Sequence, residues 1–138
     1  MKAKNIMFQL TPKAEVTYLF DDDTIGEALE KFKEKRYSSV PIVCRQTGTY
    51  MGTITEGDIL WELCTHKAGD FEDTCAQRVC NVKRYRDNEP VDVDTNMEDL
   101  VAKVSNQNFV PVIDSMNCFI GIVTRRAVIA YLKEHQGQ

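Results

Sequence analysis

The stretch MGTITEGDILWEL at residues 51–63 has a counterpart later in the chain, IGIVTRRAVIAYL at residues 120–132. At a constant offset, Gly52 aligns with Gly121 and Thr55 with Thr124, and the apolar positions that follow also correspond. Upstream of each stretch lies a second matched block, VPIV at residues 40–43 and VPVI at residues 110–113. Two matched blocks in the same order predict a tandem repeat.

Each copy is predicted to form strand, helix, strand, strand and helix. Hydrophobic residues recur at helical spacing in residues 24–36 and 95–106, and short runs of β-branched and aromatic residues predict the strands. The predicted strands are residues 16–20, 39–44 and 50–54 in the first copy and 90–93, 109–113 and 118–123 in the second. The remaining helices are predicted at residues 55–63 and 124–133, with Thr24 and Thr55 as N-caps.

The fold class expected from these elements is α/β, with a first repeat at residues 6–66 and a second at residues 88–135. Residues 67–87 form the expected linker, with a short helix around residues 71–78. A repeat of this size buries too little apolar surface to be stable alone, so the two copies are expected to pack against each other.

Composition excludes several classes of protein. The 138 residues are 43% hydrophobic and 28% charged, which is typical of a globular domain. A net charge of −4 disfavours a dedicated nucleic-acid binder, although the basic run KRYR at residues 83–86 keeps that alternative open. No apolar run is long enough to cross a membrane, and the N-terminus lacks the hydrophobic region of a signal peptide. The five cysteines are therefore expected to be reduced thiols in the cytoplasm.

The first candidate binding motif is Gly-x-x-Thr-x-x-Asp at residues 52–58. Thr55 lies where a predicted strand meets a predicted helix, and helix N-termini favour anions such as phosphate. Asp58, one turn later, has the acceptors to bind a ribose diol. The alternative is that Thr55 is only an N-cap and Asp58 only a favourable first-turn acid.

The second motif differs, because Thr124 is followed by Arg125, Arg126 and Ala127. The ribose-binding acid is thus absent, and two guanidinium groups stand at a helix N-terminus, where the helix dipole disfavours positive charge. Arginine binds phosphate through a bidentate fork, so this pair suggests that the ligand supplies an anion. The alternative is a solvated surface pair that balances the chain's own acids.

No catalytic constellation is found in the sequence. Walker, dinucleotide and nucleophile-elbow motifs are absent. Cys64, His66, Cys75 and Cys80 do not follow a known zinc-ligand spacing, so no metal site is expected. We therefore do not expect an enzyme.

In both copies the last predicted strand ends in a glycine, two residues and a threonine, and in the first copy Asp58 follows three residues later. Two copies of this layout closely resemble a tandem pair of CBS domains, the Bateman module. The resemblance spans residues 6–133. With Arg125 and Arg126 in the last motif, the layout resembles that of small stand-alone bacterial CBS proteins, some of which bind cyclic di-AMP. It implies two repeats related by pseudo-two-fold symmetry, two ligand clefts between them, and a homodimer. The implied ligands are adenosyl compounds: AMP, ADP, ATP or cyclic di-AMP, and sometimes NAD or S-adenosylmethionine.

The resemblance also implies which residues line each nucleotide-binding cleft. One cleft would combine Thr124, Arg125 and Arg126 with Val16, Thr17, Tyr37, Ser38 and Ser39. The backbone near Val16 and Ser38 would contact the adenine, while the arginines hold phosphate. The other cleft would combine Thr55 and Asp58 with Asn108 and Phe109. Because Ala127 replaces the acid, the first cleft fits a ligand held by two phosphates, and the second fits AMP or adenosine.

The resulting hypothesis is a regulatory module that senses an adenine nucleotide and signals to a separate partner protein. No membrane partner is expected. The alternative is a scaffold with degenerate, ligand-free clefts that acts only through protein interactions.

Overall fold

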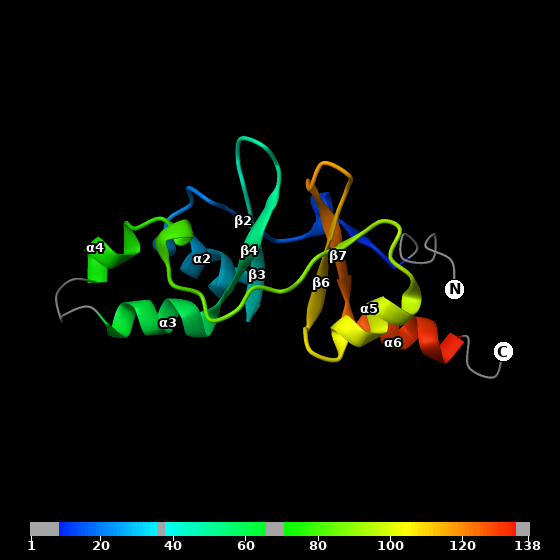
Figure 1. Cartoon of the computed structure of the whole chain (residues 1–138). Coiled ribbons are helices and arrows are strands. Elements are labelled where there is room, and N and C mark those ends of the chain that lie inside the picture. The colour runs from blue at the N-terminus through cyan, green and yellow to red at the C-terminus, as the bar shows by residue number, and fades with distance from the viewer. Residues whose placement is uncertain (1–8, 36–37, 66–70, 135–138) are drawn as a thin grey trace. The chain divides into compact units, whose positions relative to one another are not determined.

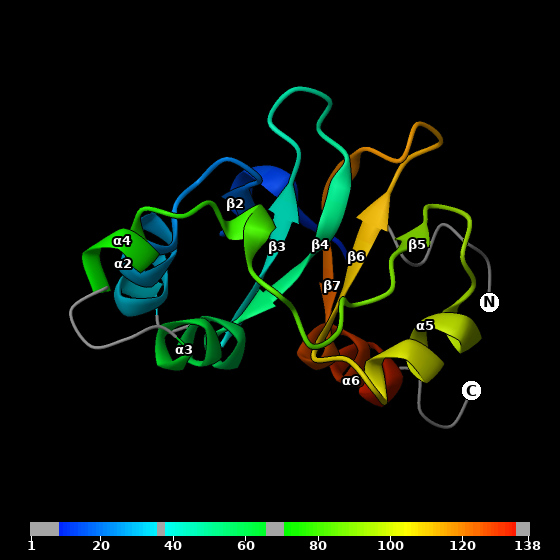
Figure 2. The same cartoon turned by 60° about the vertical axis from the view of Figure 1, so that its left-hand side comes forward.

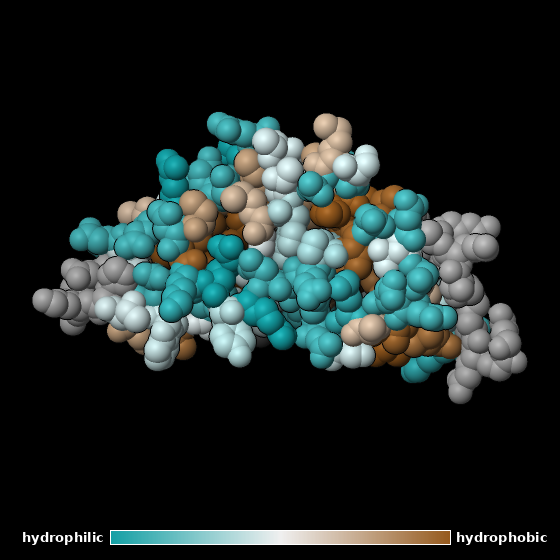
Figure 3. All heavy atoms as spheres, in the orientation of Figure 1, coloured by the Kyte–Doolittle hydropathy of each residue, from teal (hydrophilic) through white to brown (hydrophobic). Residues whose placement is uncertain are grey.

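The computed structural model describes residues 9–35, 38–65 and 71–134 of the chain (Figure 1). The chain divides into two compact units. The central unit is Thr17–Asp87, and the terminal unit joins the segment that ends at Val16 to the chain from Asn88 onward. Most of the surface in Figure 3 is hydrophilic, in keeping with a chain of which 28% is charged.

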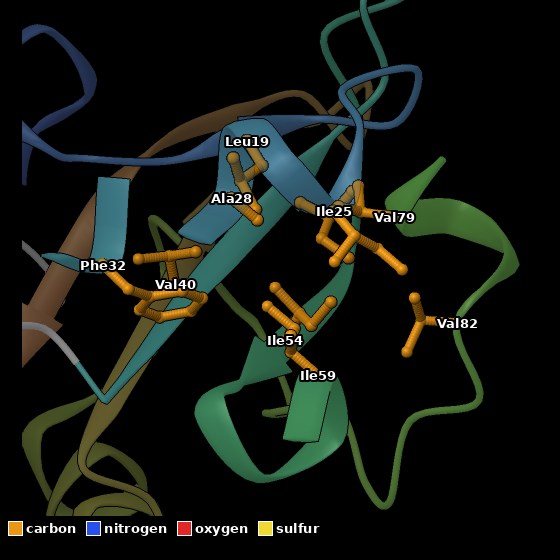
Figure 4. Close-up of a cluster of buried hydrophobic side chains, with 10 residues drawn as sticks. Leu19, Ile25, Ala28, Phe32, Val40, Ile54, Ile59, Val79 and Val82 are labelled. Atoms are coloured by element: carbon orange, nitrogen blue, oxygen red, sulfur yellow. The ribbon is translucent and has the colours of Figure 1, made fainter. Parts of the chain in front are cut away.

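The central unit is a three-stranded sheet with helices packed on it. Its strands are β2 (Leu19–Phe20), β3 (Ser39–Val43) and β4 (Tyr50–Thr55), in the order β2-β3-β4, with β2 parallel and β4 antiparallel to β3. Its helices are α2 (Ile25–Lys35), α3 (Glu56–Cys64), α4 (Phe71–Cys75) and the 3-10 turn η2 (Val79–Asn81). Apolar side chains from these elements form one buried cluster (Figure 4): Leu19, Ile25, Ala28, Phe32, Val40, Ile42, Ile54, Ile59, Val79 and Val82.

The terminal unit repeats this arrangement and adds an edge strand. Its sheet has the order β1-β7-β6-β5, with β1 (Thr11–Pro12), β5 (Val91–Asp92), β6 (Phe109–Ile113) and β7 (Phe119–Thr124). The 3-10 turn η1 (Lys13–Glu15) follows β1, and the helices are α5 (Met97–Val104) and α6 (Arg125–Glu134). Its separate core consists of Val91, Met97, Leu100, Val104, Val110, Val112, Val123, Val128 and Tyr131.

The strand registers confirm the internal repeat. Ile42 faces Gly52 in the central unit, and Val112 faces Gly121 in the terminal unit. Each ladder is then interrupted by a bulge at the next residue, Val43 or Ile113. The predicted α/β fold of two β-α-β-β-α repeats is therefore correct.

The structure differs from the sequence prediction at the start of the first repeat. The predicted strand at residues 16–20 begins only at Leu19, because Val16 ends the turn η1 and donates its N–H to the Lys13 carbonyl at 3.1 Å. The edge strand β1 was not predicted. It contains Pro12. Proline is tolerated in an edge strand, because the side of the strand without a neighbouring strand needs no backbone N–H donor. The proposed repeat boundaries at 6–66, 67–87 and 88–135 stay a prediction.

Within the described residues, no helix has both the length and the hydropathy to cross a membrane.

Gly121 makes room for the edge strand β1. Pro12 pairs with Gly121, and a Cβ built on this glycine would collide with the carbonyl oxygen of Thr11. The same Cβ would also lie 2.9 Å from Leu10 Cδ1, and the backbone φ of Gly121 is +158°, a value that L-residues rarely adopt. Any side chain at this position would therefore separate β1 from β7.

We expect the substitution Gly121→Ala to lower the free energy of unfolding by about 1–3 kcal/mol, because a backbone clash cannot be relieved by a rotamer change. Urea denaturation checks this value. The control is Gly57→Ala in the first turn of α3, where the new Cβ would meet Thr55 Oγ1 at 3.6 Å, an ordinary van der Waals contact. An equal loss in both variants would contradict the proposed clash.

Candidate functional site

In each repeat the last strand continues directly into a helix, with a threonine at the junction. β4 ends at Thr55 and α3 begins at the next residue, and β7 ends at Thr124 immediately before α6 (Figure 2). Thr55 pairs with Ser39, and Thr124 pairs with Phe109. We call β3 and β6 the Val-Pro strands, since each contains one of the matched Val-Pro pairs. Each helix N-terminus therefore lies beside the first residue of the Val-Pro strand of its own repeat.

The residue before each Val-Pro strand also binds this helix N-terminus. The carbonyl of Ser38 accepts the N–H of Glu56 at 3.0 Å, and the carbonyl of Asn108 accepts the N–H of Arg125 at 3.2 Å. The structure thus brings Ser38 and Asn108 to the two motifs, each within its own unit.

The Thr55 motif forms a complete capping box. Thr55 Oγ1 accepts the Asp58 N–H at 3.0 Å, and Asp58 Oδ2 accepts the Thr55 N–H at 3.0 Å. This arrangement satisfies two backbone donors that the helix leaves unpaired. The capping role that we considered as the alternative for Thr55 and Asp58 is therefore present. It does not exclude a ligand, because each carboxylate oxygen has a second lone pair.

Asp58 also binds the backbone of Tyr85, in the segment that the sequence predicts as the linker. Its second oxygen, Oδ1, accepts the N–H of Tyr85 at 3.0 Å, and the Asp58 side chain is buried, with only 6% of the residue exposed. This contact was not predicted, since no local pattern connects residues so distant in the chain. The carboxylate that we expected to bind ribose is thus positioned by the backbone N–H groups of Thr55 and Tyr85.

The rest of this linker segment is fixed by Asp87. Asp87 Oδ1 accepts the Thr53 N–H at 2.9 Å and the Arg84 Nε–H at 2.8 Å. The hydrogen bond to Asp87 raises the pKa of Arg84 above its ordinary value. Nearby, burial raises the pKa of Tyr50, whose hydroxyl lies 2.6 Å from Thr53 Oγ1.

The Thr124 motif has the cap without the carboxylate. Thr124 Oγ1 accepts the Ala127 N–H at 3.1 Å, but the alanine has no group that can return a hydrogen bond to Thr124. The position of Asp58 in α3 is thus taken in α6 by an uncharged side chain, and the first turn of α6 also has Arg125 and Arg126 where α3 has Glu56 and Gly57.

The structure separates the two arginines at the start of α6. Arg125 Nε donates to the carbonyl of Val104, the last residue of α5, at 2.8 Å. A cation is favourable there because carbonyl groups are unpaired at a helix C-terminus. Arg126 is exposed and has no hydrogen-bond or ion-pair partner among the residues that the structure describes. Arg126 is consequently the guanidinium available to hold an anion, whereas Arg125 connects two helices.

Two buried amide side chains that sequence analysis missed support the start of β6. Gln107 pairs with the Glu89 backbone, accepting its N–H at 2.8 Å and donating to its carbonyl at 3.2 Å. Asn88 Nδ2 donates to the Phe109 carbonyl at 3.1 Å. These bonds position Asn108 and Phe109. Gln107 lies in the polar run SNQN at residues 105–108 and Asn88 in the polar run RDNE at residues 86–89, so nothing in the sequence distinguishes them from exposed polar residues.

The other predicted site residues lie in separate units. Val16 is in the terminal unit, whereas Thr17, Ser38 and Ser39 are in the central unit. Tyr37 lies outside the described residues. Because each predicted cleft combines residues of both units, the two clefts stay a prediction.

No three His, Cys, Asp or Glu side chains form a group that could hold a metal ion within residues 9–35, 38–65 and 71–134.

Comparison with known proteins identifies the family. The family model for the CBS domain matches residues 4–64 and again residues 82–134. The chain belongs to the CBS-domain family. Both CBS repeats thus include the strand–helix junctions described above. No curated protein sequence matches this chain.

Solved structures of CBS proteins share the fold. The CbpB protein of Listeria monocytogenes, in complex with c-di-AMP, matches with a TM-score of 0.79 and 23% identity, over 95% of this chain and 96% of that chain. CBSX2 in complex with AMP matches with a TM-score of 0.74 and 21% identity, over 94% of this chain and 96% of that chain. A CBS domain protein from Streptococcus pneumoniae matches with a TM-score of 0.82 and 21% identity, over 97% of this chain and 90% of that chain. These similarities establish the fold of the CBS repeats.

We expect Asp58→Ala to destabilise the protein by about 1–2 kcal/mol, because it removes half of the capping box and the acceptor of the Tyr85 amide. Hydrogen exchange of the Thr55 and Tyr85 amides should become faster, which NMR can measure residue by residue. The control is Asp99→Ala at the equivalent helical position of α5, where the cap uses the Asp99 amide rather than its carboxylate. Unchanged exchange at Tyr85 in Asp58→Ala would contradict the linker contact.

The two arginines should respond differently to truncation. Arg125→Ala should lower the free energy of unfolding by about 1 kcal/mol, because the α5 carbonyl loses a charged donor. Arg126→Ala should stay within about 0.5 kcal/mol of wild type, as is usual for an exposed side chain without a partner. Thermal denaturation of the two variants side by side checks this, and equal stabilities would contradict the assignment.

Proposed function

We propose that this protein is a regulatory module that binds an adenine nucleotide and transmits its occupancy to a separate partner protein. The observation that carries the proposal is the pair of threonine-capped helix N-termini, each beside a Val-Pro strand, in a chain of two CBS repeats. Structural neighbours in complex with AMP and with c-di-AMP support the choice of ligand class.

The proposed site at α3 suits a ribose. Asp58 has carboxylate lone pairs for a diol, and Thr55 and the first turn of α3 present the positive end of the helix dipole. Glu56 is exposed at the same turn and would repel an extended polyphosphate. We therefore propose AMP or adenosine for this site.

The proposed site at α6 suits a ligand with more than one phosphate. Arg126 supplies an uncompensated guanidinium, and Ala127 removes the negative charge that Asp58 provides in the other repeat. We propose cyclic di-AMP here, with phosphate held by Arg126 and Thr124. The combination with Val16, Thr17, Ser38 and Ser39 is implied by family resemblance.

We propose that the protein acts in the cytoplasm and that nucleotide binding changes its affinity for a separate partner protein. Reciprocal coupling of 1–3 kcal/mol between nucleotide and partner is typical of such devices.

We also propose a homodimer, which the exposed apolar residues on two helices support: Leu60 and Trp61 on α3, and Ile129 and Leu132 on α6. The alternative is a ligand-free scaffold.

A thermal-shift screen with AMP, ADP, ATP and cyclic di-AMP tests the proposal. A ligand at 100 times its Kd adds about 2.7 kcal/mol to the free energy of unfolding, which raises Tm by several degrees for a domain of this size. We expect stabilisation by AMP that depends on Asp58, and stabilisation by cyclic di-AMP that depends on Arg126.

The matched variants are Arg126→Ala and Asp58→Ala, each compared with its own ligand-free Tm. An Arg126→Ala protein that binds cyclic di-AMP as tightly as wild type would remove the phosphate role of this residue. Absence of any shift with all four nucleotides would exclude nucleotide sensing and favour the scaffold.

A further inference from the structure

The segment Arg84–Asp87, at the end of the central unit, is held firmly by hydrogen bonds within that unit. Its first residue forms an ion pair with its last, with Arg84 Nε 2.8 Å from Asp87 Oδ1. Asp87 also accepts the Thr53 N–H of β4 at 2.9 Å, and Tyr85 donates its N–H to Asp58 at 3.0 Å. The backbone on both sides of Tyr85 is therefore tied to the sheet and to α3.

A glycine in β4 allows this close approach. A Cβ built on Gly52 would lie 2.6 Å from Asp87 Oδ1 and 2.8 Å from its Cγ. Real Cβ atoms do not come so close, so the Asp87 carboxylate occupies the space that any other residue at position 52 would fill. The position of the segment is thus built into the strand that leads to the Thr55 motif.

The ring of Tyr85 is left in solvent by this firmly held backbone. The residue is 92% exposed, the highest value among the large hydrophobic residues that the structure exposes. Burying an aromatic ring against another surface is favourable, and tyrosine at such a position is typical of binding surfaces. A ring on an anchored backbone can make such a contact with less loss of conformational entropy than one on a free loop.

The anchor of Tyr85 is the same carboxylate that we assign to the ribose. Asp58 Oδ2 accepts the Thr55 N–H, while Asp58 Oδ1 accepts the Tyr85 N–H. A nucleoside held through its diol at Asp58 would therefore lie next to the Tyr85 backbone. Stacking on an aromatic ring suits every nucleobase, since each has a π-face.

From this geometry we propose that Tyr85 is a ligand-binding residue of the α3 site, where its ring stacks on the base of a nucleotide whose ribose is held by Asp58. This inference rests on the proposed nucleotide site at α3 and extends it to the linker. Because Tyr85 and the ribose share one carboxylate, the linker conformation and the occupancy of the site become coupled.

The experiment measures the Kd of AMP for wild type, Tyr85→Ala and Tyr85→Phe by isothermal titration calorimetry. Loss of a stacked ring weakens binding on the order of tenfold, so Tyr85→Ala should raise the Kd by about that factor. Tyr85→Phe retains the ring and should stay within about twofold of wild type. Because Tyr85 is almost fully exposed, both variants should fold like the wild type.

The matched control is Phe71→Ala, which removes another exposed aromatic ring of the central unit, at the start of α4 with 59% exposure. This variant should bind AMP like wild type. Asp58→Ala serves as the marker of the α3 site, and its affinity for AMP should fall.

The outcomes separate the two proposals. A wild-type chain that does not bind AMP overturns the proposed AMP site and the role of Tyr85 together. If wild type binds AMP and Tyr85→Ala binds it equally well, only the role of Tyr85 is overturned. AMP binding that Asp58→Ala leaves intact also overturns it, because the nucleotide is then held elsewhere.

Discussion

The candidate sites depend on one constraint, the threonine at which a strand becomes a helix without an intervening loop. Thr55 and Thr124 each pair in an antiparallel ladder and also cap the following helix. Side chains alternate between the faces of a strand, so a shift of one residue would turn each threonine to the opposite face and separate it from its helix. The ladder of β3 and β4 therefore sets the position of Thr55 and Asp58, and the ladder of β6 and β7 sets that of Thr124 and Arg126.

On this shared frame the two repeats differ in charge and in hydrogen bonding. Asp58 closes the capping box in the first repeat, whereas Ala127 leaves it open in the second. The second repeat adds arginines, but Arg125 is used to bind the end of α5, so only Arg126 faces solvent without a partner in the described part of the chain. Equivalent positions of the duplicated fold thus differ in charge and make different hydrogen bonds.

Structural and functional roles overlap most closely at Asp58. Its carboxylate caps α3 and holds the linker, and it is also the acceptor that we propose for a ribose. A buried carboxylate needs hydrogen-bond donors, and the backbone N–H groups of Thr55 and Tyr85 meet that need before any ligand arrives. The proposed nucleotide would then find the carboxylate already oriented, at a lower entropic cost.

The sequence by itself determined the repeat, the α/β class, most helices and strands, and the threonine caps. These features follow from periodicity and from contacts three or four residues apart, which a linear pattern records. Only the tertiary structure decided that Thr11–Pro12 completes a sheet, that Arg125 binds Val104, and that Asp58 holds Tyr85. These partners are 21 residues apart or more, and they meet because both packed cores bring distant backbone together. Local spacing does not encode such meetings, since the same side chains could find other donors and acceptors in a different packing.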